Sequence, residues 1–587
     1  MNEANNTAGS GLPSKKELTR AVGSFSHREK KLFIVLAGLF AVSFLWLTYK
    51  INQEFSATVP ARGGTLVEGI IGTPRLINPI LAISDADRDI TELVYSGLLR
   101  RMPDGEIVPD LAESYEISKD GLSYTFTLKT NITFHDGEPI TTEDIEFTIN
   151  KAQDPTLKSP KRLNWEGVVV QRLDEKKIRF VLKQPYTPFL ENATLGILPK
   201  HIWKNISVEQ MNLSDFNTNG VGSGPYKIES IKKDSSGIPA YYRLNSFSNF
   251  SLGKPNINTI TIRFYANEKD LVSALEKGDV DNINAIAPEY AKDLSEKFQI
   301  ITTPLPRIFG IFFNQNQSPA LSDIVVRRAL NSVIDRKAII DSVLYGYGVP
   351  AYGPIPKTGE NYVPAYTGPD SPSQEEKIAE ARKTLEKAGW KWNEEKKVLE
   401  KTVKKVTTPL SFSITTADTP ELKAAALLAE SQWEKLGANI EIRIFESGDL
   451  NQNIIRPRKY DALLFGEIIR QDSDPYAFWH SSQRNDPGLN IAVYANSTVD
   501  KLLETARTTL DDKKRQEAYL SLEKEISNDV PAIFLYSPDF IYVLKKDLKG
   551  VDFGETTVPS ERFTAVHKWY LETENVWKIF ANKENII

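Results

Sequence analysis

One uninterrupted run of apolar residues stands near the start of the chain, over residues 32–49. As a helix rising about 1.5 Å per residue it is about 27 Å long, close to the thickness of a bilayer core. Basic residues between Lys15 and Lys31 precede it, so the positive-inside rule puts the N-terminus in the cytoplasm and the main body outside. The pattern predicts one uncleaved transmembrane helix, and the alternative is a signal peptide cleaved near Ala61.

Beyond this run, short alternating segments come first and helical segments follow. Tyr124, Phe126 and Leu128 alternate with polar residues, which predicts a strand with one buried face. A capping box over residues 141–144 predicts the start of a helix. After Ala266, helical and strand patterns alternate, which indicates an α/β protein. The helices expected from spacing cover residues 87–99, 267–277, 323–344, 375–388, 421–436, 497–510 and 512–528.

Composition narrows the chemistry that this chain of 587 residues can carry. It has no cysteine, which removes disulfides, thiolate metal sites and a lipid-modified cysteine anchor. Its formal net charge of −5 argues against a nucleic-acid partner. Its five histidines show no metal-ligand spacing, and neither a GxSxG nor a GxxxxGK[ST] motif occurs. We therefore expect no catalytic residues, no metal and no cofactor, and a protein that is not an enzyme.

An ordered set of motifs carries a resemblance to a known family. The run AESYEISKDGLSYTFTLK from Ala112, then FHDGEPI from Phe134, GSGPYK from Gly222 and VRRALN from Val326 occur in the order typical of that family. The chain closely resembles the family-5 extracellular solute-binding proteins of peptide and nickel ABC importers. The similarity covers roughly residues 62–575, nearly the whole exported part.

The resemblance implies an α/β clamshell of the periplasmic-binding-protein type, type II-like, with ligand bound between two lobes. The two chain crossings that form the hinge are expected near Ala266 and Tyr536. The predicted parts are a cytoplasmic tail (1–31), a transmembrane helix (32–49), a tether (50–61), lobe I (62–266, with an extra β-rich subdomain at about 106–210), lobe II (267–535) and a C-terminal return to lobe I (536–587).

The resemblance also implies a function. The protein would be a cell-membrane, single-pass solute-binding protein that captures peptides and delivers them to an ABC permease with its associated ATPase. The same fold also suits a nickel chelate, an opine or an oligosaccharide. A ligand-sensing ectodomain is a further alternative, although the short cytoplasmic part shows no signalling domain.

The candidate ligand-binding residues occupy loops and strand ends that would face the cleft. They are Asn78, Ser84, Asp85, Trp165, Gly222, Ser223, Gly224, Tyr226, Glu467, Gln471, Asp472 and Trp479. The glycines allow a close approach of backbone, either to a ligand or in a tight turn. The two tryptophans either wall side-chain pockets or pack in the core.

The segment from Gly466 to Pro475 departs from the family pattern. Peptide binders of this type usually fix the ligand's ammonium with an aspartate about four residues before the proline of an Asp-Pro pair. Alignment on Pro475 puts Gln471 at that place, and alignment on Gly466 puts Arg470 there. The anchor has therefore moved to Glu467 or Asp472, or the ligand lacks a free amine at this point. A glutamate after a buried strand is costly without a partner, which favours a function for Glu467.

Overall fold

A computed structural model describes residues 15–186, 188–356, 372–468, 475–509, 511–554 and 556–581. The chain divides into two compact units. The first joins residues 1–61 to residues 572–587, and the second is the body, residues 62–571.

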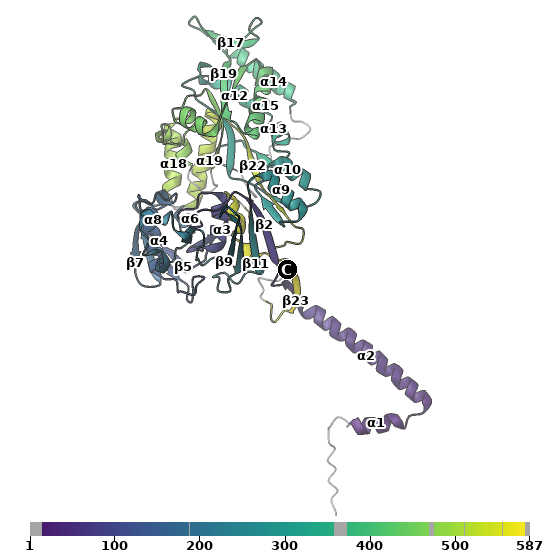
Figure 1. The fold of residues 1–587 in the computed structure, drawn as a ribbon. Helices are drawn as coiled ribbons and strands as arrows, with labels where there is room; N and C mark the ends of the chain where they lie inside the picture. The colour runs from purple at the N-terminus through teal and green to yellow at the C-terminus, as the bar shows by residue number, and fades with distance from the viewer. Residues whose placement is uncertain are drawn as a thin grey trace, which may run out of the picture. The chain divides into compact units, whose positions relative to one another are not determined.

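The first unit contains the apolar helix and a two-stranded ribbon (Figure 1). Its helix α2 is longer than the predicted span, and among the described residues it alone is long and apolar enough to cross a membrane. Strand β1 pairs antiparallel with β23, so residues 56–60 of the expected tether form a strand with the C-terminal end of the chain. The elements are α1 (Lys15–Gly23), α2 (His27–Phe55), β1 (Ser56–Pro60) and β23 (Thr573–Trp577).

A mixed sheet of 12 strands runs through the described part of the body. Figure 1 shows β19 near one end and β9 near the other, with β22 between them. The path of the sheet is β20-β19-β21-β14-β22-β12-β2-β11-β10-β9, and β13 and β15 also pair with β22. In that order the strands are Asn439–Phe445, Ser411–Ala417, Ala462–Ile468, Arg307–Phe313, Ala532–Leu544, Asn282–Asn284, Thr65–Ile71, Thr259–Tyr265, Pro239–Ser246 and Tyr226–Lys233, then β13 Gln299–Pro304 and β15 Gly348–Pro350.

The other strands of the described body form three smaller sheets. The four-stranded sheet β5-β6-β8-β7 lies within residues 106–210, where the extra β-rich subdomain is expected, and Tyr124, Phe126 and Leu128 are buried as the alternation predicts. The charged segment from Lys391 forms β16-β17-β18. The strands are β3 (Leu99–Arg101), β4 (Ile107–Pro109), β5 (Ala112–Ile117), β6 (Ser123–Leu128), β7 (Val169–Arg172), β8 (Lys177–Val181), β16 (Lys391–Asn393), β17 (Val398–Val403) and β18 (Val406–Pro409).

Most of the predicted helices are present, and the capping box at Thr141 is confirmed. The single helix predicted over residues 323–344 is wrong. It is two helices, α12 and α13, because Asp335 leaves the helical conformation and caps α13 by accepting a hydrogen bond from the Ala338 N–H. The longer helices of the body are α3 (Asp85–Val94), α4 (Thr142–Gln153), α9 (Glu268–Lys277), α10 (Pro288–Leu294), α12 (Ile324–Val333), α13 (Arg336–Val343), α14 (Gln374–Lys387), α15 (Pro420–Leu436), α18 (Ser497–Thr508) and α19 (Asp512–Asp529).

Strand β22 joins two parts of the body. Its first half, residues 532–536, pairs with β14, and its second half, residues 539–544, pairs with β13. Only Leu305 and Pro306 separate β13 from β14, so the chain passes between the two parts twice at one level. Strand β12 and helix α9, which follow the crossing predicted near Ala266, still pair and pack with β2, so the strand pairing changes first at Leu305.

Separate hydrophobic cores lie on the two sides of this level. One core is built within residues 308–536. A second is built within residues 66–262, with additions from Leu305 and residues 540–569. A smaller third core joins α9 and α10 to the second half of β22. Two large cores joined by two crossings of the chain give the two-lobed α/β architecture that the family resemblance implies.

A buried ion cluster ties the C-terminal return to the core within residues 66–262. The Arg562 guanidinium donates hydrogen bonds to Asp89 at 2.9 and 2.7 Å and to Glu68 at 3.0 Å. The Tyr542 hydroxyl donates to Glu68 at 2.8 Å. Burial raises the pKa of both carboxyls, and the guanidinium opposes that rise. The cluster joins β2, α3, β22 and the turn that holds Arg562, so removing the cation leaves two carboxylates buried without it.

Candidate functional site

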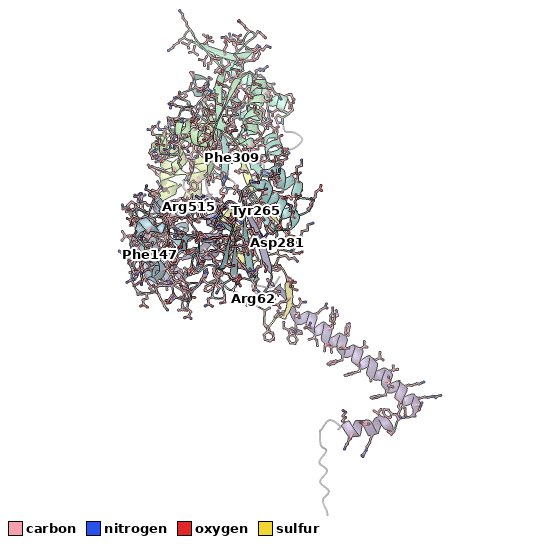
Figure 2. The ribbon with its side chains drawn as sticks, viewed as in Figure 1. Arg62, Phe147, Tyr265, Asp281, Phe309 and Arg515 are labelled. Carbon is pink, nitrogen blue, oxygen red and sulfur yellow. The ribbon has the colours of Figure 1, made fainter. Side chains whose placement is uncertain are left out.

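An aromatic pair marks the level at which the chain crosses between the two parts. The Phe309 ring on β14 stacks on the Tyr536 ring on β22, with ring centroids 5.2 Å apart. Gly466 on β21 lies beneath Phe309, and a Cβ added there would be 2.7 Å from Phe309 Cε1. Figure 2 shows Phe309 near the middle of the body. The missing side chain at Gly466 therefore lets the ring lie flat against the strands that connect the lobes.

Glu467, the next residue on β21, is a buried acid in an apolar setting. Its side chain is 4% exposed, and its Oε1 has no hydrogen-bond partner among the described residues. It stands opposite Ile308 of β14. Burial alone raises the pKa of Glu467 well above its ordinary value. A carboxyl kept neutral by burial is costly to hold without a partner, so it is available to a cation brought by a ligand.

Two more charged groups lie at the crossing. Asp539 on β22 has an Oδ1 without a partner in the described structure, and burial raises its pKa to about 6 against a hydrogen bond from Thr302. Arg307 begins β14, and its Nε also has no partner there. Burial lowers the pKa of Arg307, and the Asp85 carboxylate at the start of α3 opposes this. Glu467, Asp539 and Arg307 thus place acidic and basic groups with polar atoms unbonded in the described structure at the level where the chain crosses between the two parts. We call this level the crossing zone.

A pocket of about 200 Å³ adjoins this zone. Ser537 of β22 and Pro350 of β15 line it, together with Tyr352 and, from α19, Glu523. The Arg336 guanidinium stacks on Tyr352 at 4.7 Å from the ring centroid. The volume is below the range of about 300–1,000 Å³ typical of small-molecule sites, so this pocket suits one side chain rather than a whole ligand.

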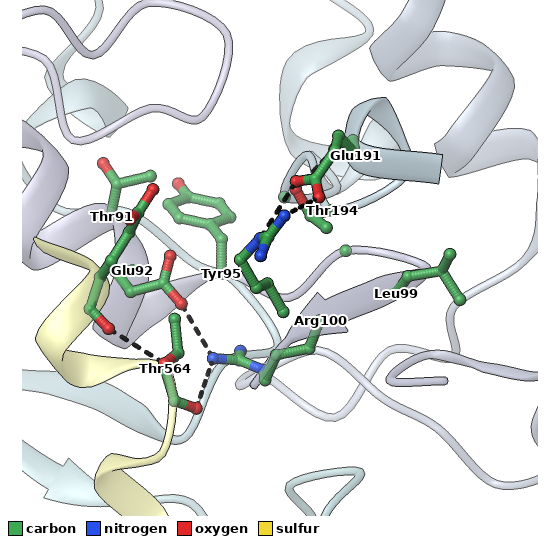
Figure 3. Close-up of a pocket in the computed structure, with 12 residues that line it drawn as sticks. Thr91, Glu92, Tyr95, Leu99, Arg100, Glu191, Thr194 and Thr564 are labelled. Carbon is green, nitrogen blue, oxygen red and sulfur yellow. Dashed lines mark hydrogen bonds and ion pairs between the residues drawn. The ribbon is translucent and has the colours of Figure 1, made fainter. Parts of the chain in front are cut away.

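A second pocket, of about 120 Å³, lies beside α3 in the part of the body that holds the core within residues 66–262 (Figure 3). Its lining is charged. Arg100 bonds to Glu92 at 2.9 Å and to the Thr564 carbonyl at 3.2 Å, and Arg101 pairs with Glu191. Burial raises the pKa of Glu92 to about 7, and Arg100 opposes the rise. Its cations and acids are already paired with one another, so this pocket is a packed ionic network apart from the crossing.

Several of the predicted ligand-binding residues make contacts within the fold. Asn78 is buried and its amide donates to Asn217 at 3.1 Å. Ser84 caps α3 in a capping box with Asp87. A Cβ at Gly222 would lie 2.1 Å from the Val94 carbonyl oxygen, and one at Gly224 would meet the Leu93 carbonyl oxygen at 2.6 Å. The close backbone approach expected of these glycines is made to the end of α3. Ser223, between them, is buried, with an Oγ that lacks a partner in the described structure.

The large aromatic candidates belong to the cores. Trp165 packs edge-on against Phe180 and Phe189. Trp479 packs near Phe312 with its ring fully buried. Tyr226 is fully buried, and its hydroxyl donates to the Ile257 carbonyl at 3.0 Å. Core packing, the alternative weighed for the tryptophans, describes these positions. Gln471 and Asp472 lie outside the described residues.

Sequence reasoning placed a crossing near Tyr536 but missed Arg307, Phe309 and Asp539 beside it. A signal exists in hindsight, because Arg307 and Asp539 each directly follow a proline and begin an apolar strand segment. A lone charge in such a segment is expensive to bury unless it meets a partner.

Among the described residues, no group of three or more His, Asp or Glu side chains is arranged to hold a metal ion.

Comparison with known proteins gives matches over most of the chain. The model of a family described as "Bacterial extracellular solute-binding proteins, family 5 Middle" matches residues 106–488. The oligopeptide-binding protein AppA of Bacillus subtilis is 30% identical over 529 residues, which cover 89% of this chain and 94% of AppA.

Solved structures agree with this similarity. AppA of Bacillus subtilis in complex with a nonapeptide superposes with a TM-score of 0.64 at 28% identity, covering 87% of this chain and all of that one. The substrate-binding protein CtaP of Listeria monocytogenes gives 0.71 at 29% identity, covering 87% and 99%. NikZ of Campylobacter jejuni in complex with Ni(L-His) gives 0.65 at 27%, covering 86% and 99%.

Proposed function

The chain belongs to the bacterial extracellular solute-binding proteins of family 5, and from this membership we propose that it captures peptides and passes them to the permease of an ABC importer. The observation that carries the proposal is the match to an oligopeptide-binding protein over 94% of that relative's length. The same match covers 89% of this chain.

The crossing strands support a hinge. We assign residues 62–304 and 539–571 to lobe I and residues 307–536 to lobe II, because strand pairing and core composition change at these points. Two short crossings at one level allow the lobes to close by small changes in a few backbone angles. A ligand that contacts both lobes favours the closed state, because only closure completes its contacts.

Glu467 is the residue that we propose as the anchor for the peptide's ammonium group. It is a buried carboxyl without a partner in the described structure, and it lies two residues before the segment 469–474 where the family carries its acid. A bound ammonium stabilises the ionised carboxylate and lowers its pKa. Peptide affinity should therefore increase with pH until the free carboxyl is ionised without help.

The test is calorimetric titration of the full chain, stripped of ligand in detergent, with one short peptide in free and N-acetylated forms. The proposal predicts tighter binding of the free amine, and a loss of at least tenfold, about 1.4 kcal/mol, for Glu467→Gln. Glu441→Gln, at an exposed glutamate on strand β20 of the same sheet, is the matched control.

The outcomes separate the two parts of the proposal. Peptide binding that survives in Glu467→Gln but fails in Asp472→Asn moves the anchor to Asp472. Binding that is equal in all variants removes the anchor and leaves peptide capture standing. Absence of binding for every peptide in the wild-type chain overturns the function, and a titration with nickel and free histidine then tests the cargo named for NikZ.

We further propose that α2 is an uncleaved membrane anchor with the body outside. Cleavage near Ala61 would remove β1 and leave β23 without its pairing strand. Ala57 and Val59 of β1 are buried, as expected of a strand kept in the mature protein. N-terminal sequencing of protein from membranes should start before residue 32. A start near Arg62 would show that the segment is a signal peptide.

A further inference from the structure

The C-terminal end of the chain is bonded to the end of the apolar helix. The Trp577 Nε1 donates to Asn52 Oδ1 at 2.8 Å. The Lys578 backbone N–H donates to the Phe55 carbonyl at 2.7 Å, and its Nζ donates to the Glu54 carbonyl at 2.8 Å. These contacts, with the β1–β23 pairing, lie within the first unit. They hold residues 573–581, the C-terminal ribbon, beside the last turns of α2.

The ribbon carries apolar side chains with no cover in the described structure. Ile579 is 74% exposed, Phe580 75% and Trp577 47%. Phe55 and Ile51 of α2 are also exposed. Single exposed apolar residues are ordinary, but a group that is contiguous with an apolar helix marks a surface that meets another phase or partner.

The rise of the helix gives the distance of these exposed side chains from the end of the apolar run, measured along the helix axis. The apolar run ends at Tyr49, so Asn52 lies about 4.5 Å beyond it along the helix and Phe55 about 9 Å beyond it. The polar interfacial layer of a bilayer is about 5–8 Å thick on each side of the hydrocarbon core. Trp577 bonds to Asn52, which lies inside this layer, and Lys578 bonds to Phe55, which lies just beyond it. The ribbon therefore stands at the lipid headgroups and their outer edge.

The residue types of the ribbon are those expected at a membrane interface. Tryptophan is enriched at membrane interfaces because its ring is apolar and its N–H needs a polar partner. Lys578 presents a cation where anionic headgroups lie. We propose that the C-terminal ribbon binds the outer surface of the bilayer, with Trp577, Ile579 and Phe580 in the interfacial layer. The proposal rests on the membrane anchor proposed above, and it gives the unit two lipid contacts, one from each end of the chain.

The absence of cysteine allows a direct test in the full chain. Ile579→Cys and Phe580→Cys are spin-labelled and reconstituted in vesicles of phosphatidylcholine with phosphatidylglycerol. Collision rates are measured with oxygen, which concentrates in lipid, and with a nickel chelate, which stays in water. Phe40→Cys, on the exposed surface of α2, is the lipid control, and Leu213→Cys, 86% exposed on the body, is the aqueous control.

We expect the ratio of oxygen to nickel collisions at residues 579 and 580 to fall between those of the two controls. Ratios equal to that of Leu213→Cys, with Phe40→Cys reading as lipid, overturn the ribbon contact and leave the anchor intact. An aqueous reading at Phe40→Cys overturns both, because the helix is then not inserted.

Discussion

Glu467→Gln is the substitution that separates a functional acid from a structural one. The wild-type side chain is 4% exposed with one oxygen unbonded among the described residues, and burial alone shifts its pKa upward. Glutamine keeps the shape of the protonated acid and removes its titration. A structural acid held by a partner would lose stability on this change, whereas an acid held in reserve for a ligand would not.

The direction in which pH changes the folding stability follows from proton binding to Glu467. Above the ordinary pKa of 4.5, the unfolded chain releases the Glu467 proton while the folded chain keeps it. The folded state therefore loses relative stability as the pH rises, by about 1.4 kcal/mol per pH unit for one proton, until the raised pKa is reached. Glutamine does not titrate, so the variant does not lose this stability. The free energy of unfolding of the variant minus that of wild type should therefore increase by about 1.4 kcal/mol per pH unit.

The assay is denaturant unfolding of ligand-free protein followed by tryptophan fluorescence, at a series of pH values from 5 upward. Other buried acids titrate equally in both proteins, so the difference isolates Glu467. Glu441→Gln should show no such rise, because its exposed carboxyl pairs with Arg443, which lowers its pKa. If the free energy of unfolding of Glu467→Gln minus that of wild type stays constant or falls as the pH rises, the acid is ionised and paired. That result would refute the proposed anchor.

Four further substitutions test the crossing and the core. Gly466→Ala should lower the free energy of unfolding by about 1–3 kcal/mol, since the new methyl group displaces the Phe309 ring, and Phe309→Leu should restore part of it in a thermal melt. Arg562→Met should cost about 3–5 kcal/mol in urea unfolding by leaving two buried carboxylates without their cation. Asp539→Asn should gain stability over wild type as the pH rises from 3.8 to about 6, because the raised pKa makes the ionised acid unfavourable; a constant difference across that range would contradict this.

Local pattern was enough to predict many elements of the fold. The alternation at Tyr124 and the capping box at Thr141 depend on neighbouring residues, and both are confirmed. The break at Asp335 was missed because the apolar spacing continues through it, and only the cap shows where one helix ends. The crossing near Leu305 depends on which strands pair across the sheet, which periodicity does not reveal.

The site was less accessible to prediction for the same reason. Glu467 was found because a charge in an apolar strand is anomalous in sequence. The glycines at Gly222 and Gly224 signalled close packing, but a sequence does not say whether the close neighbour is a ligand or, as here, the end of α3. The ribbon at Trp577 joins residues more than 500 positions apart, a contact without any local signal.

Peptide capture is tested by native mass spectrometry of the full chain, released from detergent after exposure to a defined peptide mixture. We expect a set of bound masses that fragment as peptides and that decrease in Glu467→Gln. A single bound mass that is not a peptide, or no bound mass at all, would contradict peptide capture.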